Sequence, residues 1–198
     1  MTSKIKVNIL ADGGDNSIIT SDGAGSFTAS SGLASSVQSV GGIQNTPAFS
    51  VRFNGTNSTG HSHNSITKVP FNTEDFDTDN AFDISSNYRF TVPSGKAGKY
   101  FFYGQVSTKG ASNAERRSHY TWLYKNDSAV AKRGLFGTTQ IFEGGQETIT
   151  DISRTLDLSV GDYVDLRVQV YDNLSGDYTI VGDTPNCTYF TGYRLIGA

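Results

Sequence analysis

The sequence has little of several residue types, and each scarcity excludes a class of protein. Among its 198 residues there is one cysteine, Cys187, so no disulfide can form within the chain. No apolar run approaches the ~20 residues that span a bilayer, which argues against membrane insertion. Charged residues make up 18% of the chain and the formal net charge is −3, so the composition gives no electrostatic basis for binding nucleic acid.

The first residues do not have the pattern of a secretory signal. The apolar stretch VNILA at 7–11 is short and is followed at once by Asp12, whereas a signal has a longer apolar core. We therefore expect a protein that reaches the outside of a cell without secretion, as a virion component released by lysis.

The sequence is rich in glycine and aromatic residues. It contains 22 Gly, 12 Phe and 10 Tyr, a composition that favours short strands and tight turns. Apolar and polar residues alternate in several stretches, most clearly at Val164, Leu166, Val168 and Val170. Turn signals recur about every 8–12 residues and no helical periodicity is sustained. The sequence therefore predicts an all-β sandwich or jelly roll.

The stretch 71–104 organises this prediction. RFTV at 89–92 and KYFFYGQVSTK at 99–109 are predicted strands that the turn PSGKAG connects. Aromatic residues on both faces of the longer strand indicate a central strand. Further strand pairs are predicted around Asn126-Asp127 and around Gly161-Asp162. The polar segments 54–65 and 171–186 are predicted as loops.

Residues 1–45 differ from residues 46–198, and we predict that they form a separate segment. KVNIL at 6–10 is a short predicted strand, and IITSDGAGSFT at 18–28 predicts a hairpin that turns at Asp22-Gly23. The rest is rich in glycine, serine and alanine. A flexible tail is one interpretation. We favour an attachment segment that orders on a partner or in a homotrimer, because the hairpin resembles the N-terminal parts of phage structural and tail-fibre proteins.

Residues 46–198 resemble a known family. The residues that carry the resemblance follow the order of its signature and are Phe71, Asp77, Phe82, Phe90, Gly98, Tyr100 and Phe102. The blocks PAFSVRF at 47–53, SRTLDLSVGDYVDLRV at 153–168 and YFTGYRL at 189–195 match other strands. This part of the chain is therefore similar to the C1q-domain family, and the resemblance implies a ten-stranded C1q/TNF-like jelly roll. Gly104 departs from the pattern, because the family has an aromatic residue there.

The resemblance also implies a homotrimer whose three heads pack around an axis. Aromatic residues of outward parity are the candidates for the trimer interface, since large apolar patches on a domain usually mark an interface. These candidates are Tyr103, Tyr120, Trp122 and Tyr124.

Two groups of residues are candidate metal ligands. Asp75, Asp77 and Asp79 have the spacing that opens a calcium loop, although Asn80 and Ser86 stand where an EF-hand has Gly and Glu. Their alternative role is a solvated acidic turn.

His61 and His63 point the same way if the segment is extended, and three copies would supply imidazoles for a transition metal on the trimer axis. The alternative for these histidines is an exposed polar loop.

We predict that the protein is not an enzyme. The G-x-S-x-G nucleophile elbow is absent, and nothing close in sequence to Cys187 would activate its thiol. Recognition is the more consistent function, because tyrosine and asparagine in loops suit contact with glycans or proteins. The candidate ligand-binding residues, whose alternative is ordinary loop composition, are Arg116, Arg117, Tyr171, Asn173 and Tyr178.

The sequence therefore predicts a homotrimeric virion structural protein, either a fibre or spike or a surface-decoration component. Its N-terminal segment would bind other virion proteins, and its head would recognise a host-surface glycan or protein. The alternative is a free soluble C1q-like lectin or adhesin that belongs to no particle.

Overall fold

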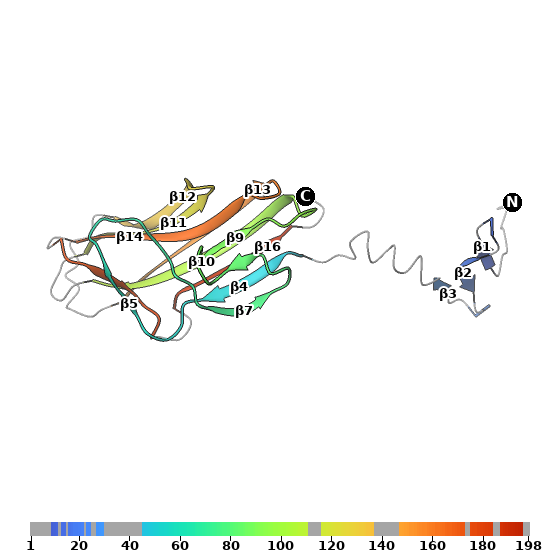
Figure 1. Ribbon diagram of the computed structural model, residues 1–198, viewed down its shortest axis with the longest axis horizontal. Helices are drawn as coiled ribbons and strands as arrows, with labels where there is room; N and C mark the ends of the chain where they lie inside the picture. The colour runs from blue at the N-terminus through green and yellow to red at the C-terminus, as the bar shows by residue number, and fades with distance from the viewer. Residues whose placement is uncertain are drawn as a thin grey trace. The chain divides into compact units, whose positions relative to one another are not determined.

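The computed structural model describes residues 9–11, 13–14, 16–21, 23–24, 27–29, 45–110, 116–136, 147–172, 175–183 and 187–195. All regular structure in these residues is β, in strands β1 to β16, and the described part of the chain has no helix suited to crossing a membrane. The chain divides into two compact units, Met1–Gln44 and Asn45–Ala198 (Figure 1). The second unit is called the head below.

The first unit contains a three-stranded antiparallel sheet with the order β1-β2-β3. Its strands are β1 (Ile9–Ala11), β2 (Ser17–Ser21) and β3 (Phe27–Ala29). Leu10 pairs with Ile19, and Ile19 pairs with Ala29. The predicted hairpin at 18–28 is observed as β2 and β3, and the predicted first strand overlaps β1.

The first sheet of the head is built around β10 (Gly98–Lys109) and is called the β10 sheet. One edge of β10 pairs along its whole length with β13 (Glu147–Leu158). The other edge pairs with β16 (Tyr189–Arg194) and then with β15 (Tyr178–Ile180). Beyond β16 lie β4 (Ala48–Arg52) and β7 (Thr73–Asp77), and beyond β15 lies β5 (Ser58–His61). The prediction that residues 99–109 form a central strand is confirmed.

The second sheet of the head is built around β14 (Tyr163–Asp172) and is called the β14 sheet. On one side lie β11 (Arg116–Lys125) and the edge strand β12 (Ser128–Phe136). On the other side lie β6 (Thr67–Lys68) and β9 (Arg89–Thr91), and β8 (Phe82–Asp83) pairs with β9. The predicted turns at 126–127 and 161–162 connect β11 to β12 and β13 to β14. The predicted neighbours β9 and β10 lie in different sheets. The strand pair predicted around Gly161-Asp162 is wrong for the same reason, because β13 pairs with β10 and β14 pairs with β11.

The two sheets pack face to face over a core of aromatic rings. Phe49 lies at its centre, with its ring centroid 5.0 Å from Phe82, 5.2 Å from Phe90 and 5.2 Å from Phe190. Alternating residues of the long strands complete the core, which includes Val51, Tyr100, Phe102, Val106, Leu123, Val164, Leu166, Val168 and Val170. Burial at this scale, at roughly 25 cal/mol per Å² of apolar surface, is the main term that stabilises the head.

Two segments that the sequence predicts as loops contain strands. β5 lies within 54–65, and β15 lies within 171–186 and brings Tyr178, Ile180 and Val181 into full burial. Tyr178 and Ile180 alternate with a half-buried Thr179, which is the period-2 pattern of a strand. The many glycine, asparagine and aspartate residues around this short run obscure the pattern in the sequence.

Candidate functional site

The outer face of the β10 sheet carries a cluster of aromatic side chains, here called the tyrosine face. It consists of Phe101, Tyr103, Tyr189 and Tyr193, all of them half-buried. Phe101 and Tyr103 point outward because their neighbours Tyr100 and Phe102 point into the core. The ring centroids of Phe101 and Tyr193 lie 5.6 Å apart, and those of Tyr103 and Tyr189 lie 5.7 Å apart.

The tyrosine face is mainly neutral. Burial raises the pKa of Tyr189 to about 12, with further contributions from its hydrogen bond with Tyr103 and from the negative charge of Asp151. Beside Tyr189 lies a hollow of about 480 Å³ that Ser50, Arg52 and Asp75 also line. The charges in this hollow are paired, because Arg52 Nε donates to Asp75 Oδ1 at 2.8 Å.

The outer face of the β14 sheet carries a second aromatic row, made of Tyr120, Trp122 and Tyr124. Cations cover these rings, whereas no cation of the described residues lies over a ring of the tyrosine face. Lys132 Nζ lies 3.5 Å from the ring centroid of Tyr120 and 4.6 Å from that of Trp122, and Arg167 Cζ lies 3.9 Å from that of Tyr124. Such cation–π contacts give the faces of these rings partners within a single chain.

A network of charges continues from this row along the β14 sheet. Asp165 is fully buried, and its carboxylate accepts hydrogen bonds from Arg167 Nε at 2.6 Å and forms an ion pair with Lys68 Nζ at 3.1 Å. Hydrogen bonding to Asp165 and Asp127 raises the pKa of Arg167. Tyr163 donates to Asp127 at 2.7 Å. No pattern in the sequence predicts this network, because its members come from β6, β14 and the β11–β12 turn.

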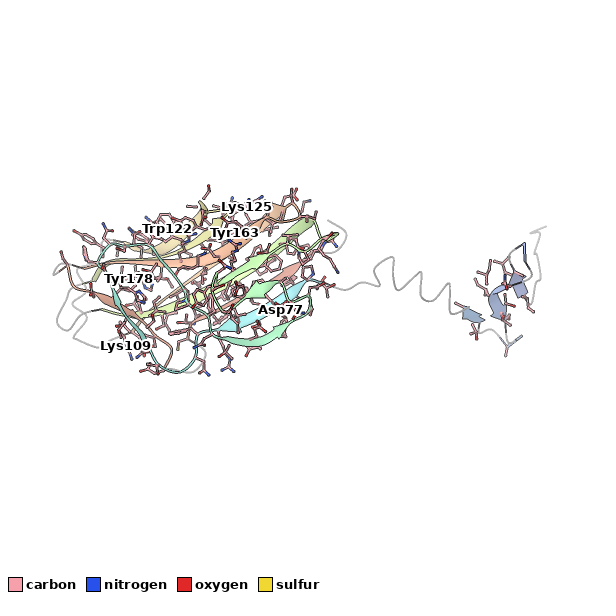
Figure 2. All side chains as sticks on the ribbon, in the orientation of Figure 1. Asp77, Lys109, Trp122, Lys125, Tyr163 and Tyr178 are labelled. Atoms are coloured by element: carbon pink, nitrogen blue, oxygen red, sulfur yellow. The ribbon has the colours of Figure 1, made fainter. Side chains whose placement is uncertain are left out.

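The four predicted interface residues do not lie on one surface. Tyr103 lies on the outer face of the β10 sheet, whereas Tyr120, Trp122 and Tyr124 lie on the outer face of the β14 sheet. In Figure 2, Trp122 and Tyr163 lie on the β14 side of the head, and Asp77 and Lys109 lie on the β10 side. The alternation of side chains correctly predicts which residues of each strand point outward. It does not predict a shared surface, because β10 and β11 belong to opposite sheets. One flat contact cannot bury all four residues.

His61 and His63 do not point to a common site. The His61 ring lies 5.3 Å from the ring of Tyr178, and the His63 ring lies 4.7 Å from the ring of Tyr171. The extended geometry expected for this pair ends at His61, since β5 stops there and Asn64 has φ 59°. Burial lowers the pKa of His61, while a hydrogen bond with Ser58 and the charge of Asp177 oppose this effect.

The three predicted calcium ligands also diverge. Asp75 pairs with Arg52, Asp77 accepts a hydrogen bond from the backbone N–H of Phe82 at 2.7 Å, and Asp79 Oδ1 lies 3.5 Å from Lys96 Nζ. Asp75 and Asp77 lie in β7, where a register shift at Asp75 separates their directions. Across the described residues, no three His, Cys, Asp or Glu side chains gather in a way that could hold a metal ion. The alternative role, an acidic turn with internal partners, fits these carboxylates.

The predicted ligand-binding residues have different surroundings. Tyr171 is 36% exposed and is the one whose ring the structure places at the surface. Tyr178 was wrongly predicted as a surface residue: it is fully buried, and its hydroxyl donates to Thr67 Oγ1 at 2.7 Å. The side chains of Arg116 and Arg117, and Asn173 as a whole, lie outside the described part of the structure.

One pair of residues with catalytic chemistry was not found in the sequence. Ser58 Oγ lies 2.8 Å from His61 Nε2, a contact of the kind that activates a serine nucleophile. The two residues lie three positions apart in the edge strand β5, and the half-buried His61 ring lies beside that of Tyr178. Burial raises the pKa of Cys187, so its thiol stays protonated at neutral pH and is a poor nucleophile.

Comparisons with known proteins identify the fold. No protein-family model and no curated protein matches the sequence. Among solved structures, the globular domain of zebrafish complement 1qA protein matches with a TM-score of 0.50 and 19% identity, over 75% of this chain and 97% of its own length. The Eiger TNF structure from S. frugiperda matches with a TM-score of 0.54 and 12% identity, over 76% of this chain and 93% of its own length. The head is therefore a C1q/TNF-like jelly-roll domain, and the predicted fold class is confirmed.

Proposed function

We propose that the chain is a non-enzymatic virion structural protein, a homotrimeric fibre, spike or surface-decoration component. Its head would recognise a glycan or protein on the host surface. The tyrosine face is the observation that carries the proposal, because it gives the head a neutral aromatic surface suited to burial against copies of itself.

The tyrosine face supports assembly better than the aromatic row of the β14 sheet. Tyrosine and other aromatic side chains are enriched at the centres of protein interfaces, where charged residues are depleted. Among the described residues, no cation lies over Phe101, Tyr103, Tyr189 or Tyr193, whereas Lys132 and Arg167 already cover the other row. The apolar side chain of Phe76, which is 49% exposed on β7, extends the same face. Three heads related by a threefold axis would each bury this surface against a neighbouring copy.

Recognition would then depend on multivalency. Tyr171 and His63 form a surface aromatic pair at the end of β14, and an exposed tyrosine offers contact area at a low entropic cost. A trimer would present this pair three times, and several trimers on one particle would present it many more times. Linked weak sites of this kind gain avidity of about 10²–10⁴ over a single site.

Light scattering tests the assembly. We expect the head, residues 45–198, to have the mass of a trimer, since its core lies entirely within this unit. Tyr193→Asp places a charge in the tyrosine face and is expected to give monomers. Tyr120→Asp is the matched control on the opposite sheet and is expected to leave the trimer intact. A monomeric wild-type head would overturn the trimer.

A free soluble lectin or adhesin is the second candidate, and the self-contained core of the head favours it, because the head needs no particle to fold. Antibody against the head distinguishes the two candidates. Immunogold labelling of particles released from the source cells supports the virion assignment. Protein found only in the particle-free supernatant contradicts that assignment and supports the free lectin or adhesin.

A further inference from the structure

The β1–β3 sheet has apolar side chains on both faces, and none of its described side chains is buried. Ile9 is 53% exposed and Leu10 is 52% exposed. Leu10, Ile19 and Ala29 pair across the three strands and share one face. Ile9, which pairs with Thr20, lies on the opposite face. Among the described residues of the unit no second layer covers either face of the sheet, so Ile9 and Leu10 are open to a neighbour.

The size of this sheet favours such a neighbour. Its strands span three, five and three residues. Small sheets without a packing layer are marginally stable at best in water. The exposed apolar residues are the surface on which such a layer would pack.

The chemistry of the strands favours a second copy of this chain as the neighbour. The strand sequences ILA, SIITS and FTA contain no charged residue. Identical segments that meet around a symmetry axis place like residues close together, and like charges there are destabilising. A neutral, β-branched surface meets this condition, whereas a partner of complementary charge would find no charge on the strands to bind.

The position of β4 in the head would bring the three copies together. β4 begins at Ala48, which pairs with Tyr193 of the tyrosine face. In the proposed trimer, the three chains therefore enter their heads beside the interface, and residues 30–44 connect each head to its own β3. Tethering of this kind raises the effective concentration of the three sheets to about the millimolar range.

We propose that the β1–β3 sheets of three chains pack against one another through Ile9, Leu10 and Ile19. They form a second assembly contact, here called the foot, separate from that of the head. This inference rests on the proposed trimer. In a trimer each sheet has a neighbour on either side, so both of its faces are covered. Contact with a single partner surface would cover only one face.

Amide hydrogen exchange on the full-length protein tests the foot. In wild-type trimers we expect the amides of β1–β3 to exchange at least about tenfold more slowly than in an unfolded chain. The paired substitution Leu10→Asp with Ile19→Asp is expected to remove this protection and to leave the head trimeric by light scattering. Gly13→Asp is the control: it adds one negative charge outside the strands, where an added Cβ meets no atom within 4 Å, and is expected to keep the protection.

A third variant separates failure of the foot from failure of the proposed head trimer. In the full chain, Tyr193→Asp is expected to make protection of β1–β3 depend on protein concentration, because the tether no longer gathers the sheets. Trimeric wild-type protein with unprotected β1–β3 amides would overturn the foot alone. Protection that persists in monomers at nanomolar concentration would also overturn the foot. Protection that appears only when released particles are added would overturn it too, and would indicate docking on another virion protein.

Discussion

Gly104 of β10 lies against Leu166 of β14 so closely that a methyl group on Gly104 would come within 2.7 Å of Leu166 Cδ2. The two residues face each other across the sandwich, and Phe190 closes the same space at 3.2 Å. C1q-like signatures have an aromatic residue at this position. Here the opposite sheet fills the volume, so the glycine is a consequence of core packing.

Gly104→Ala is expected to destabilise the head by about 1–3 kcal/mol, because overpacking a dense core forces side chains away from their preferred rotamers. Urea unfolding of the head measures the change. Combining Gly104→Ala with Leu166→Ala is expected to cost less than the sum of the single substitutions, since each residue occupies the space of the other. Strict additivity would show that the two positions do not compete for that space.

Asp165→Asn is expected to cost about 3–5 kcal/mol of unfolding free energy, because removing one partner of a buried ion pair leaves the others uncompensated. Lys68 and Arg167 would then face each other across a neutral amide. Asp75→Asn is the matched control, since the Asp75 side chain is 42% exposed and its pair with Arg52 is worth about 0–1 kcal/mol. Urea unfolding measures both variants. An equal loss of unfolding free energy in the two would contradict the argument that burial makes the ion pairs of Asp165 more important than that of Asp75.

His61 is expected to make the head less stable in mild acid. Burial lowers the pKa of His61 below its ordinary value of 6.5, so the unfolded chain takes up a proton at a pH where the folded chain does not. Its contribution is therefore fully present above about pH 6.5 and is lost as the pH falls through the lower pKa of the folded state. Urea midpoints at pH 7.5 and 5.5 measure the loss, which His61→Gln should reduce. An unchanged pH dependence in that variant would assign the effect to other groups.

Calcium is expected to leave the thermal midpoint of the head unchanged, because Asp75, Asp77 and Asp79 each have a different partner within the chain. Scanning calorimetry in millimolar calcium and in EDTA provides the comparison. A midpoint that rises with calcium and falls with EDTA would restore the predicted calcium site, and Asp77→Asn would then show whether the acidic turn holds the ion.

The sequence predicts those parts of the fold that depend on residues close together in the chain. Alternation places Val164, Leu166, Val168 and Val170 in the core. The turn residues at 126–127 mark the hairpin of β11 and β12, whereas those at 161–162 mark a connection between the two sheets. These features are local, so the alternation of apolar and polar residues and the identity of the turn residues are enough to predict them. The order of the C1q-like blocks extends this local information to the jelly roll as a whole.

The candidate site could be predicted only in part, because it depends on which sheet each strand joins. Tyr103 and Tyr120 have the same outward parity, yet they lie on opposite faces of the head. Tyr178 sits among loop-forming residues but becomes buried when β15 adds to β10. The Asp165 network joins segments about a hundred residues apart, and no spacing rule connects them. Contacts of this kind follow from tertiary packing, which strand propensity does not determine.

Both ends of the head emerge at the same pole. Arg194 N donates to the carbonyl oxygen of Pro47 at 3.1 Å, so the last strand finishes where the first one starts. The opposite pole, near Lys109, is about 40 Å away along the twelve residues of β10. A particle that holds the chain by its N-terminal unit would therefore display the Lys109 pole to its surroundings. A fluorophore or an affinity tag on the C-terminus would report on the anchored pole, and a label for the displayed pole belongs near Asp183, which lies within 3.5 Å of Lys109.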